Sequence, residues 1–509
     1  MIRLILAALL TLIASRAAAD VVEGLSWMHS FEYERALAAF ERAEKADPKN
    51  AMAYWGQAMC YEQLIWGNEN VEEARAILAR MRRNGALASA RPKDRSWLAT
   101  LDALFGDGDR PSRLAAYAAA MSRLAAEYPD DPDVAALHGL AVLATRARGL
   151  AGAHPSTSLG AGHGDRELPQ LVGSAEQEQA ASIFAGIIKG HPRHPGALHY
   201  LIHAWDDPAN AHKALDAARA YATVVPESSH ARHMPAHIFF HLGMWEEAIA
   251  ADEAAAAAAD AKVLKDALPV TAADFHPLSW LVYEYLQAGR IADARRTVER
   301  LRKPAESTQD PRLLSLAATL RSRVAVEGRV ADMVPGPSFV NYDELFAVGF
   351  TAVERGDLAL AERARTRLAE LARQPRYAER HAVLEIMALQ VGAAIRAKSN
   401  DAEGALALLA DATRAERALP ASIGPPALIK PAQEQYAEQL ALAGRLEEAV
   451  AQYDGALERA PRRRLSLEGR ERAAGATRDL KSQAWPIGGG LLTVIIALIA
   501  IRRRRARAA

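Results

Sequence analysis

An all-α fold of stacked helix pairs is predicted for this chain by its composition, by a recurring motif and by the period of that motif. Half of the 509 residues are hydrophobic but only 6% are aromatic, and most of the excess is alanine, a strong helix former. A chain of this length exceeds one compact core and is typical of several domains or of one long repeat array. We therefore expect a right-handed superhelix of helix pairs with no sheet.

The recurring motif is a glycine followed by a helical segment centred on alanine. Its first copy contains Gly24, Trp27, Ala36, Phe40, Ala43 and Pro48. Later copies follow Gly243, Gly289, Gly356 and Gly444. Glycine permits a tight turn between two helices, small alanines let the helices approach, and proline ends the second helix. One such pair cannot bury its apolar face alone, so the pairs are expected to stack and to form an extended concave surface.

The period of the motif is regular in the middle of the chain. The interval from Pro192 to Pro226 is the same as the interval from Ala180 to Ala214, and Ala248 follows Ala214 by that interval again. It equals the period of tetratricopeptide (TPR) repeats, which is about 34 residues. The sequence therefore predicts TPR-like helix pairs.

The repeats are predicted to fall into three blocks between two special ends. N-terminal repeats occupy 20–146, histidine-rich central repeats 175–302, and C-terminal repeats 303–480. The segment 147–174 is rich in Gly, Ser and Pro and predicts an inserted loop. Two further linkers are expected at 303–312 and 330–341.

The two ends of the chain predict export and a membrane anchor. Residues 1–19 combine Arg3, an apolar run and a small-residue exit, which is the pattern of a signal peptide. Residues 485–501 carry no charge and suit a single transmembrane helix, and the arginine-rich tail 502–509 would stay in the cytoplasm. We expect the repeats on the periplasmic face of the inner membrane. The glycines at 488–490 also resemble a C-terminal sorting signal, whose cleavage would remove the anchor.

Charge and motifs limit the function. Lys plus Arg equals Asp plus Glu, 62 each, so there is no electrostatic case for nucleic acid. The single cysteine, Cys60, excludes an intramolecular disulfide and a cysteine metal cluster, and its apolar surroundings predict burial. The sequence contains no HExxH, CxxCH, GxSxG or P-loop motif. We therefore predict a binding protein and not an enzyme.

Histidines are the one concentration of chemistry, because nine of the 15 fall between His191 and His241. His199 and His203 are four residues apart, so they share one helix face, as do His233 and His237 on another helix. Each residue of the second pair follows its counterpart in the first by one full repeat period. The two pairs are thus expected at equivalent places in adjacent repeats.

These four histidines are predicted to meet at one ligand-sized site on the concave face. Secondary residues of the same surface are Asp207, His230, His241, His276 and Tyr283. Several imidazoles on stacked helices can hold zinc or copper, with Asp206, Asp207 or Met234 nearby as additional ligands. The alternative is a polar groove or a packing network without metal.

The elements HPGALHYLIHA and SSHARHMPAHIFFHLG resemble a group of bacterial TPR proteins of unassigned activity that carry HYxIHA and HMPxHI[FY] motifs. The resemblance covers roughly 20–290, and it implies the TPR fold but no reaction. Here the motifs place His199 and His203 in the first element, and His233 and His237 in the second.

Three functions follow, in order of preference. The first is a membrane-anchored scaffold that binds a protein or peptide partner in its groove. The second is a copper- or zinc-binding protein that uses the histidine cluster. The third is a metal-assisted hydrolase with Asp206, Asp207 or Glu227 as base.

Overall fold

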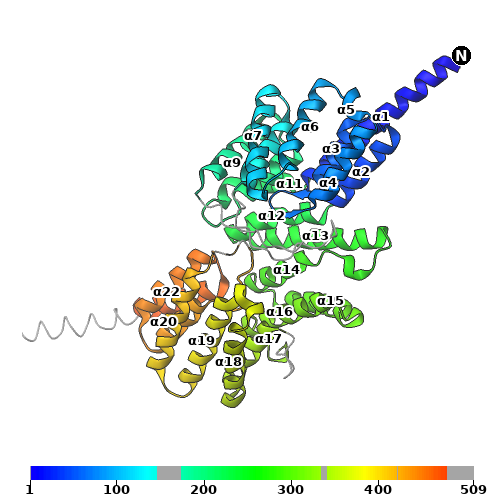
Figure 1. Cartoon of the computed structure of the whole chain (residues 1–509). Helices are drawn as coiled ribbons and strands as arrows, with labels where there is room; N and C mark the ends of the chain where they lie inside the picture. The colour runs from blue at the N-terminus through cyan, green and yellow to red at the C-terminus, as the bar shows by residue number, and fades with distance from the viewer. Residues whose placement is uncertain (1, 146–172, 334–340, 421, 423, 479–509) are drawn as a thin grey trace, which may run out of the picture. The chain divides into compact units, whose positions relative to one another are not determined.

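The computed structural model describes residues 2–145, 173–333, 341–420, 422 and 424–478. The chain forms two compact units, Met1–Leu314 with Pro420–Pro425, and Ser315–Leu419 with Pro426–Ala509. Within each unit, most helices pack against the helices that precede and follow them in sequence (Figure 1). This arrangement confirms the predicted all-α solenoid of TPR-like pairs, while the hand of the superhelix and the block boundaries stay predictions.

The helices of the first unit are α1 Ile2–His29, α2 Tyr33–Ala46, α3 Ala51–Cys60, α4 Val71–Arg83, α5 Ala86–Ser89, α6 Pro92–Leu104, α7 Arg110–Glu127, α8 Pro132–Ala144, α9 Ala175–Gly190, α10 Pro195–Ala204, η2 Ala211–Ala214, α11 Leu215–Tyr221, α12 Ser229–Leu242, α13 Trp245–Lys265, η3 Val270–Ala272, α14 His276–Gln287 and α15 Ile291–Thr308. Helix α16 Pro311–Glu327 crosses the boundary between the units. The second unit continues with η4 Ala331–Met333, α17 Tyr342–Arg355, α18 Leu358–Ala372, η5 Pro375–Arg380, α19 His381–Lys398, α20 Ala402–Ala418, α21 Ala432–Leu442 and α22 Leu446–Arg459.

Small residues let the helices pack closely, as the repeat motif predicts. Ala180, Ala214 and Ala248 are all fully buried. A Cβ atom at Gly56 would lie 2.3 Å from the ring of Phe40, so the crossing of α2 and α3 needs glycine there. Cys60 is buried in the core, as expected.

Two details of the chain path differ from the prediction. The strands β1 Glu62–Gln63 and β2 Asn68–Glu69 form a short antiparallel pair, so the expectation of no sheet is wrong. The chain reverses direction between α3 and α4 with Gly67 at a positive φ of 77°, and the backbone groups on either side of this turn pair with each other. The expected linker at 303–312 is also wrong over 303–308 and 311–312, because α15 continues to Thr308 and α16 begins at Pro311.

The expectations about the two ends are not decided by the structure. Residues 2–19 belong to α1, and cleavage of a signal peptide stays a prediction. The expected transmembrane helix 485–501 and tail 502–509 lie outside the described residues, as does 147–172 of the inserted loop. Among the helices that the structure does describe, none is both long enough and apolar enough to span a bilayer.

Helix α1 makes a contact that the linear repeat pattern does not contain. In addition to α2, it packs against α3 and α10, although α10 lies far later in the chain. Gly196 in α10 makes room for this approach, since a Cβ atom there would lie 2.3 Å from Nδ1 of His29. The end of α1 therefore covers the helix that carries the first histidine pair.

The second unit contains a buried ion-pair network. The guanidinium of Arg463 is fully buried and donates to Glu434 at 2.8 Å and to Glu327 at 2.7 Å. The ammonium of Lys430 lies 3.3 Å from Glu434 as well. Because each of these charges has an opposite charge beside it, the network can be buried without an isolated ion.

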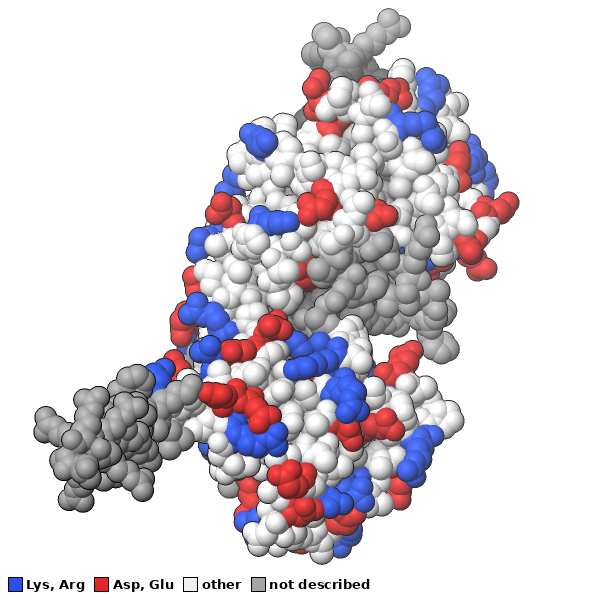
Figure 2. Space-filling view, turned by 90° about the vertical axis from the view of Figure 1, so that its left-hand side faces the viewer, with Lys and Arg blue, Asp and Glu red and all other residues white. Residues whose placement is uncertain are grey.

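Surface charges of both signs are mixed. On the face drawn in Figure 2, basic and acidic side chains alternate and form no continuous basic patch. That distribution agrees with the equal numbers of basic and acidic residues in the sequence.

Candidate functional site

The central histidines lie on two neighbouring helices, α10 and α12, which pack against each other. Helix α10 begins where the ring of His194 accepts a hydrogen bond from the backbone N–H of Ala197. Helix α12 begins in the same way at Ser228, whose hydroxyl accepts from the N–H of Ala231. These caps fix where each helix starts and therefore which face its histidines present.

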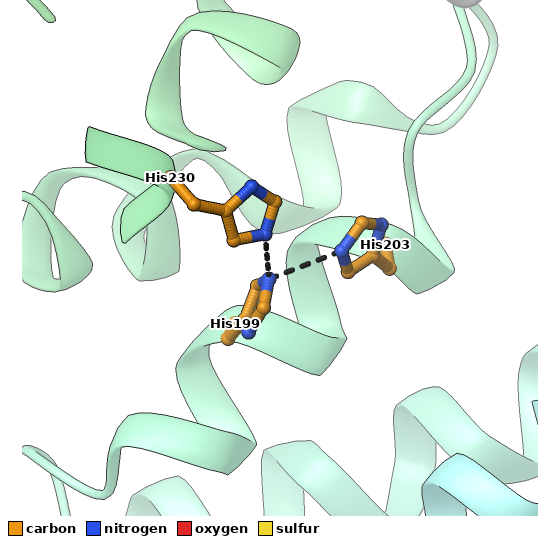
Figure 3. Close-up of side chains that lie close together, drawn as sticks. All are labelled: His199, His203 and His230. Carbon is orange, nitrogen blue, oxygen red and sulfur yellow. Dashed lines mark hydrogen bonds between the residues drawn. The ribbon is translucent and has the colours of Figure 1, made fainter. Parts of the chain in front are cut away.

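The first triad consists of His199, His203 and His230. Nε2 of His199 lies 3.0 Å from Nε2 of His203 and 3.1 Å from Nε2 of His230. Figure 3 shows the three rings turned toward one point. His199 is fully buried and the other two rings are 7% exposed. Three imidazole nitrogens thus converge in a buried site.

The tautomer of His199 is set by its other ring nitrogen. Nδ1–H donates a hydrogen bond of 2.7 Å to the backbone carbonyl of His29. Burial lowers the pKa of His199 well below its ordinary value, and the charge of His203 lowers it further. His199 is therefore neutral at pH 7, and its Nε2 lone pair points at the nitrogens of His203 and His230.

The second triad consists of His233, His237 and His276. Nε2 of His233 lies 3.1 Å from Nε2 of His237, and the ring centroid of His276 lies 4.7 Å from that of His233. One ligating atom from each of the three lies within 4.8 Å of the others. His276 comes from the start of α14 and is partly exposed.

In the second triad, carboxyl groups contact the Nδ1 atoms of the two histidines that come from α12. Nδ1–H of His237 donates to Asp206 at 2.8 Å, and Nδ1 of His233 lies 2.5 Å from a carboxyl oxygen of Asp252. Histidines that bind metals typically have such a carboxyl group or a carbonyl behind them, because it fixes the ring and makes the free nitrogen more basic. Both rings are thus oriented with Nε2 toward the centre of the triad.

The two carboxyl groups differ in their electrostatic setting. Burial alone would raise the pKa of Asp206, but the charges and hydrogen bonds of His237 and His241 outweigh it and lower that pKa. Burial raises the pKa of Asp252 well above its ordinary value, and the neighbouring Glu284 raises it further. Burial likewise raises the pKa of Glu284 to about 8.

Aromatic rings cover the two triads. The ring centroid of Phe31 lies 4.4 Å from that of His199, 5.5 Å from His203 and 5.8 Å from His230. Phe31 has a left-handed φ of 56°, a conformation that costs energy for a bulky residue. Trp280 covers the second triad, with its centroid 4.4 Å from that of His237. Backbone strain of the kind found at Phe31 is typical of a functional site.

The spacing of the nitrogens suits a metal ion. Ligands about 2.0–2.1 Å from a tetrahedral zinc ion lie about 3.3 Å from one another. The Nε2 pairs His199–His203, His199–His230 and His233–His237 are 3.0–3.1 Å apart, close to that value. All ligand atoms within each triad lie within 4.8 Å of one another. The single lone pair of His199 can align with only one N–H, whereas a central cation would engage the lone pairs of all three rings. Three ligands also leave a fourth position of such an ion open.

The structure divides the four predicted site histidines between two groups. His199 and His203 belong to the first triad, and His233 and His237 to the second. The two histidines of each pair contact each other along one helix. The third histidine differs, and is His230 in the first triad and His276 in the second. The predicted ligand site as such stays a prediction.

Three other predicted residues do not join either triad. Asp207 accepts from Asn210 and Gln177 and caps the turn after α10. Tyr283 packs against Phe240 in an apolar cluster. His241 donates to Asp206 and so supports the second triad from behind.

Sequence patterns missed the residues that surround the triads. Phe31, Asp252 and Trp280 carry no periodic signal, because they come from helix ends and helices outside the two histidine-rich elements. A third group of His29, Asp133 and His194 was also missed. Nε2–H of His29 and of His194 each donate to Asp133, at 3.0 and 3.1 Å, while His194 caps α10 with its other nitrogen. That group is a satisfied hydrogen-bond network that joins α1 and α8 to α10.

Comparisons with solved structures give matches at low identity and low TM-score. The chain is similar to the P58(IPK) TPR domain, with 15% identity over 92% of this chain and 99% of that one, at a TM-score of 0.25. It is similar to yeast Tom70, with 11% identity over 93% and 89% of the two chains, at a TM-score of 0.30. A third similar structure is the APC/C hetero-tetramer Cut9-Hcn1, with 15% identity over 90% and 76%, at a TM-score of 0.30. No protein-family model matches the chain, and no curated protein matches it in sequence.

Proposed function

We propose that this protein binds a transition-metal ion, copper or zinc, at its two histidine triads. The observation that carries the proposal is the convergence of Nε2 atoms on His199, at 3.0 and 3.1 Å, in a buried site whose histidine tautomer is fixed from behind. Imidazole is a ligand of choice for both metals. A polar groove for peptides would instead leave these side chains accessible to a partner, and they are buried.

Supporting groups around the second triad favour the same function. Asp206 orients His237, and Asp252 lies behind His233, each at hydrogen-bond distance. The two Nε2 atoms face each other 3.1 Å apart, with a carboxyl group behind each ring. A bound cation would replace the hydrogen bond between these nitrogens by two coordinate bonds.

The test is metal binding by the full chain with matched histidine variants. The protein is stripped with a chelator and titrated with Zn²⁺ and Cu²⁺, and bound metal is measured by elemental analysis. We expect tight binding by the wild type and a loss of at least about tenfold in affinity for the His203→Ala, His237→Ala double variant. The control is the His191→Ala, His212→Ala double variant, which removes two exposed histidines of the same region.

Equal binding by the two double variants would refute the proposal, as would a wild type that binds neither metal. Circular dichroism of each variant shows whether its helices are intact. A variant that binds less metal but keeps its helices supports the assignment directly.

A protein-binding scaffold is the second candidate function. It is supported by the solenoid fold and by exposed apolar side chains near the end of α13, where Leu264 is 82% exposed and Val270 43%. Cross-linking in cells should recover a defined partner with the wild type and not with a Leu264→Glu, Val270→Glu variant. A partner recovered equally with both would bind elsewhere, and no partner with either would count against the scaffold.

Export and anchoring are proposed on the sequence patterns of the two ends, 1–19 and 485–501. In this arrangement the triads would meet metal ions in the periplasm. A reporter enzyme inserted before Trp485 should be active outside the cytoplasm. Activity confined to the cytoplasm would refute the proposed topology without affecting the metal site.

A further inference from the structure

We propose that the two triads form one dinuclear copper centre that binds dioxygen between its two ions. This inference rests on the proposed metal-binding function and extends it to a ligand. Each triad supplies three histidines to its own ion and leaves a coordination position open. A small molecule that reaches both open positions can bridge the two ions.

Helix α12 brings the two triads together. It contributes His230 to the first triad and His233 and His237 to the second. His230 and His233 are three residues apart, so their Cβ atoms are about 5–6 Å apart on one face of the helix.

Asp206 joins the two halves from behind. It follows His203 of the first triad by three residues, in the turn after α10. Its carboxylate accepts from His237 of the second triad at 2.8 Å and from His241 at 3.1 Å. The position of a second-triad ligand is therefore tied to the end of the helix that carries the first pair.

The donor set favours copper. Every ligating group in the two triads is an imidazole, and affinity for nitrogen ligands in the divalent first-row series is highest for copper. The carboxyl groups of Asp206 and Asp252 face the opposite ring nitrogens, so they support the ligands. Cu⁺ and Cu²⁺ both accept imidazole, so such a centre can change its oxidation state without changing its ligands.

We take dioxygen as the bridging ligand because it is small and uncharged, and because it accepts two electrons without needing a proton. In the step, two Cu⁺ ions each give one electron to O₂, which becomes a peroxide that bridges two Cu²⁺ ions. The ions gain two positive charges and the ligand gains two negative charges, so the net charge of the centre is unchanged and no proton is needed. This matters in a buried site, where an uncompensated charge is costly. The three histidines of the first triad and His237 are each exposed by 7% or less, and this burial restricts access to small molecules.

The test uses the full chain loaded with Cu⁺ without oxygen and then exposed to O₂. We expect about two copper ions per chain and uptake of about one oxygen molecule for each pair of ions. The oxygenated protein should give an electron paramagnetic resonance signal far below that of two isolated Cu²⁺ ions, because a bridging ligand couples their spins.

Variants that break one triad at a time separate this inference from metal binding itself. His203→Ala and His276→Ala should each keep about one copper ion and lose nearly all oxygen uptake. His276 is partly exposed, so its variant carries the test even if His203→Ala fails to fold. The His191→Ala, His212→Ala variant should behave as the wild type.

Two results would overturn the dinuclear centre while leaving metal binding in place. One is a wild type with two copper ions that takes up no oxygen and shows the full signal of two isolated Cu²⁺ ions. The other is a single-triad variant that takes up as much oxygen per copper ion as the wild type. A wild type that binds no copper would refute the proposed function together with this inference.

Discussion

Nε2 of His199 lies 3.0 Å from Nε2 of His203, while Nδ1–H of His199 is held by a backbone carbonyl on the far side of the ring. The spacing of four residues along α10 brings the two rings to one face. The carbonyl, which comes from the end of α1, decides which nitrogen carries the proton. A neutral imidazole with an oriented lone pair is the form of histidine that binds metals.

Asp206→Asn should weaken metal binding by about 10–100-fold, because an amide supports the basicity and orientation of His237 less well than a carboxylate. The measurement is a competition titration with a chromophoric chelator. Asp216→Asn, which changes an aspartate outside both triads in the same region, should leave the affinity unchanged. If both variants bind as the wild type does, the carboxylate of Asp206 does not support a metal ligand.

Phe31→Gly should be more stable than Phe31→Ala by about 1 kcal/mol, because Phe31 has a left-handed φ of 56° that glycine adopts freely. Both variants lose the ring that contacts the first triad and should exchange bound metal faster than the wild type. Denaturant unfolding gives the stabilities. Phe40 lies inside α2, where alanine is the better helix former, so Phe40→Ala should be more stable than Phe40→Gly. An Ala variant at position 31 as stable as the Gly variant would contradict the strained backbone.

Glu434 should make the second unit sensitive to acid. Burial alone would raise its pKa, but Arg463 and Lys430 outweigh this effect and lower the pKa of Glu434 from 4.5 to about 2. A carboxyl group whose pKa is lower in the folded state stabilises the fold above its ordinary pKa. That contribution is lost as the pH falls from about 4.5 to about 2.

The measurement is the thermal unfolding midpoint between pH 7 and pH 2. Glu434→Gln should lower the midpoint at pH 7 and flatten its dependence on acid below about pH 4.5. Glu448→Gln, which changes an exposed carboxylate of α22, should keep the steep profile. A Glu434→Gln profile parallel to that of the wild type would show that the ion pair is not the acid-sensitive group.

Ala248→Leu should destabilise the protein by about 1–3 kcal/mol, because Ala248 is fully buried in α13 and a larger side chain would overpack the core. Denaturant unfolding at neutral pH measures the change. Ala257→Leu, at an exposed position of the same helix, is the control and should change stability by less than about 0.5 kcal/mol. Similar losses in the two variants would mean that burial of Ala248 is not the cause.

The sequence by itself determined the repeat architecture and the histidine pairs. Ala180, Ala214 and Ala248 recur once per repeat because each repeat needs a small residue in the packed core, and all three are buried. Likewise, the spacing of four residues between His199 and His203 is enough to place both on one helix face, since helix geometry is local.

Only the tertiary structure decided how the histidines group and what covers them. The third member of each triad, His230 or His276, depends on how neighbouring helices pack, and no period in the sequence encodes that. Phe31 reaches the first triad because α1 packs against α10, a contact between segments far apart in the chain. A linear array of repeats predicts contacts between neighbours, so this closure and the burial of the site that results from it could not be inferred from repeat pattern alone.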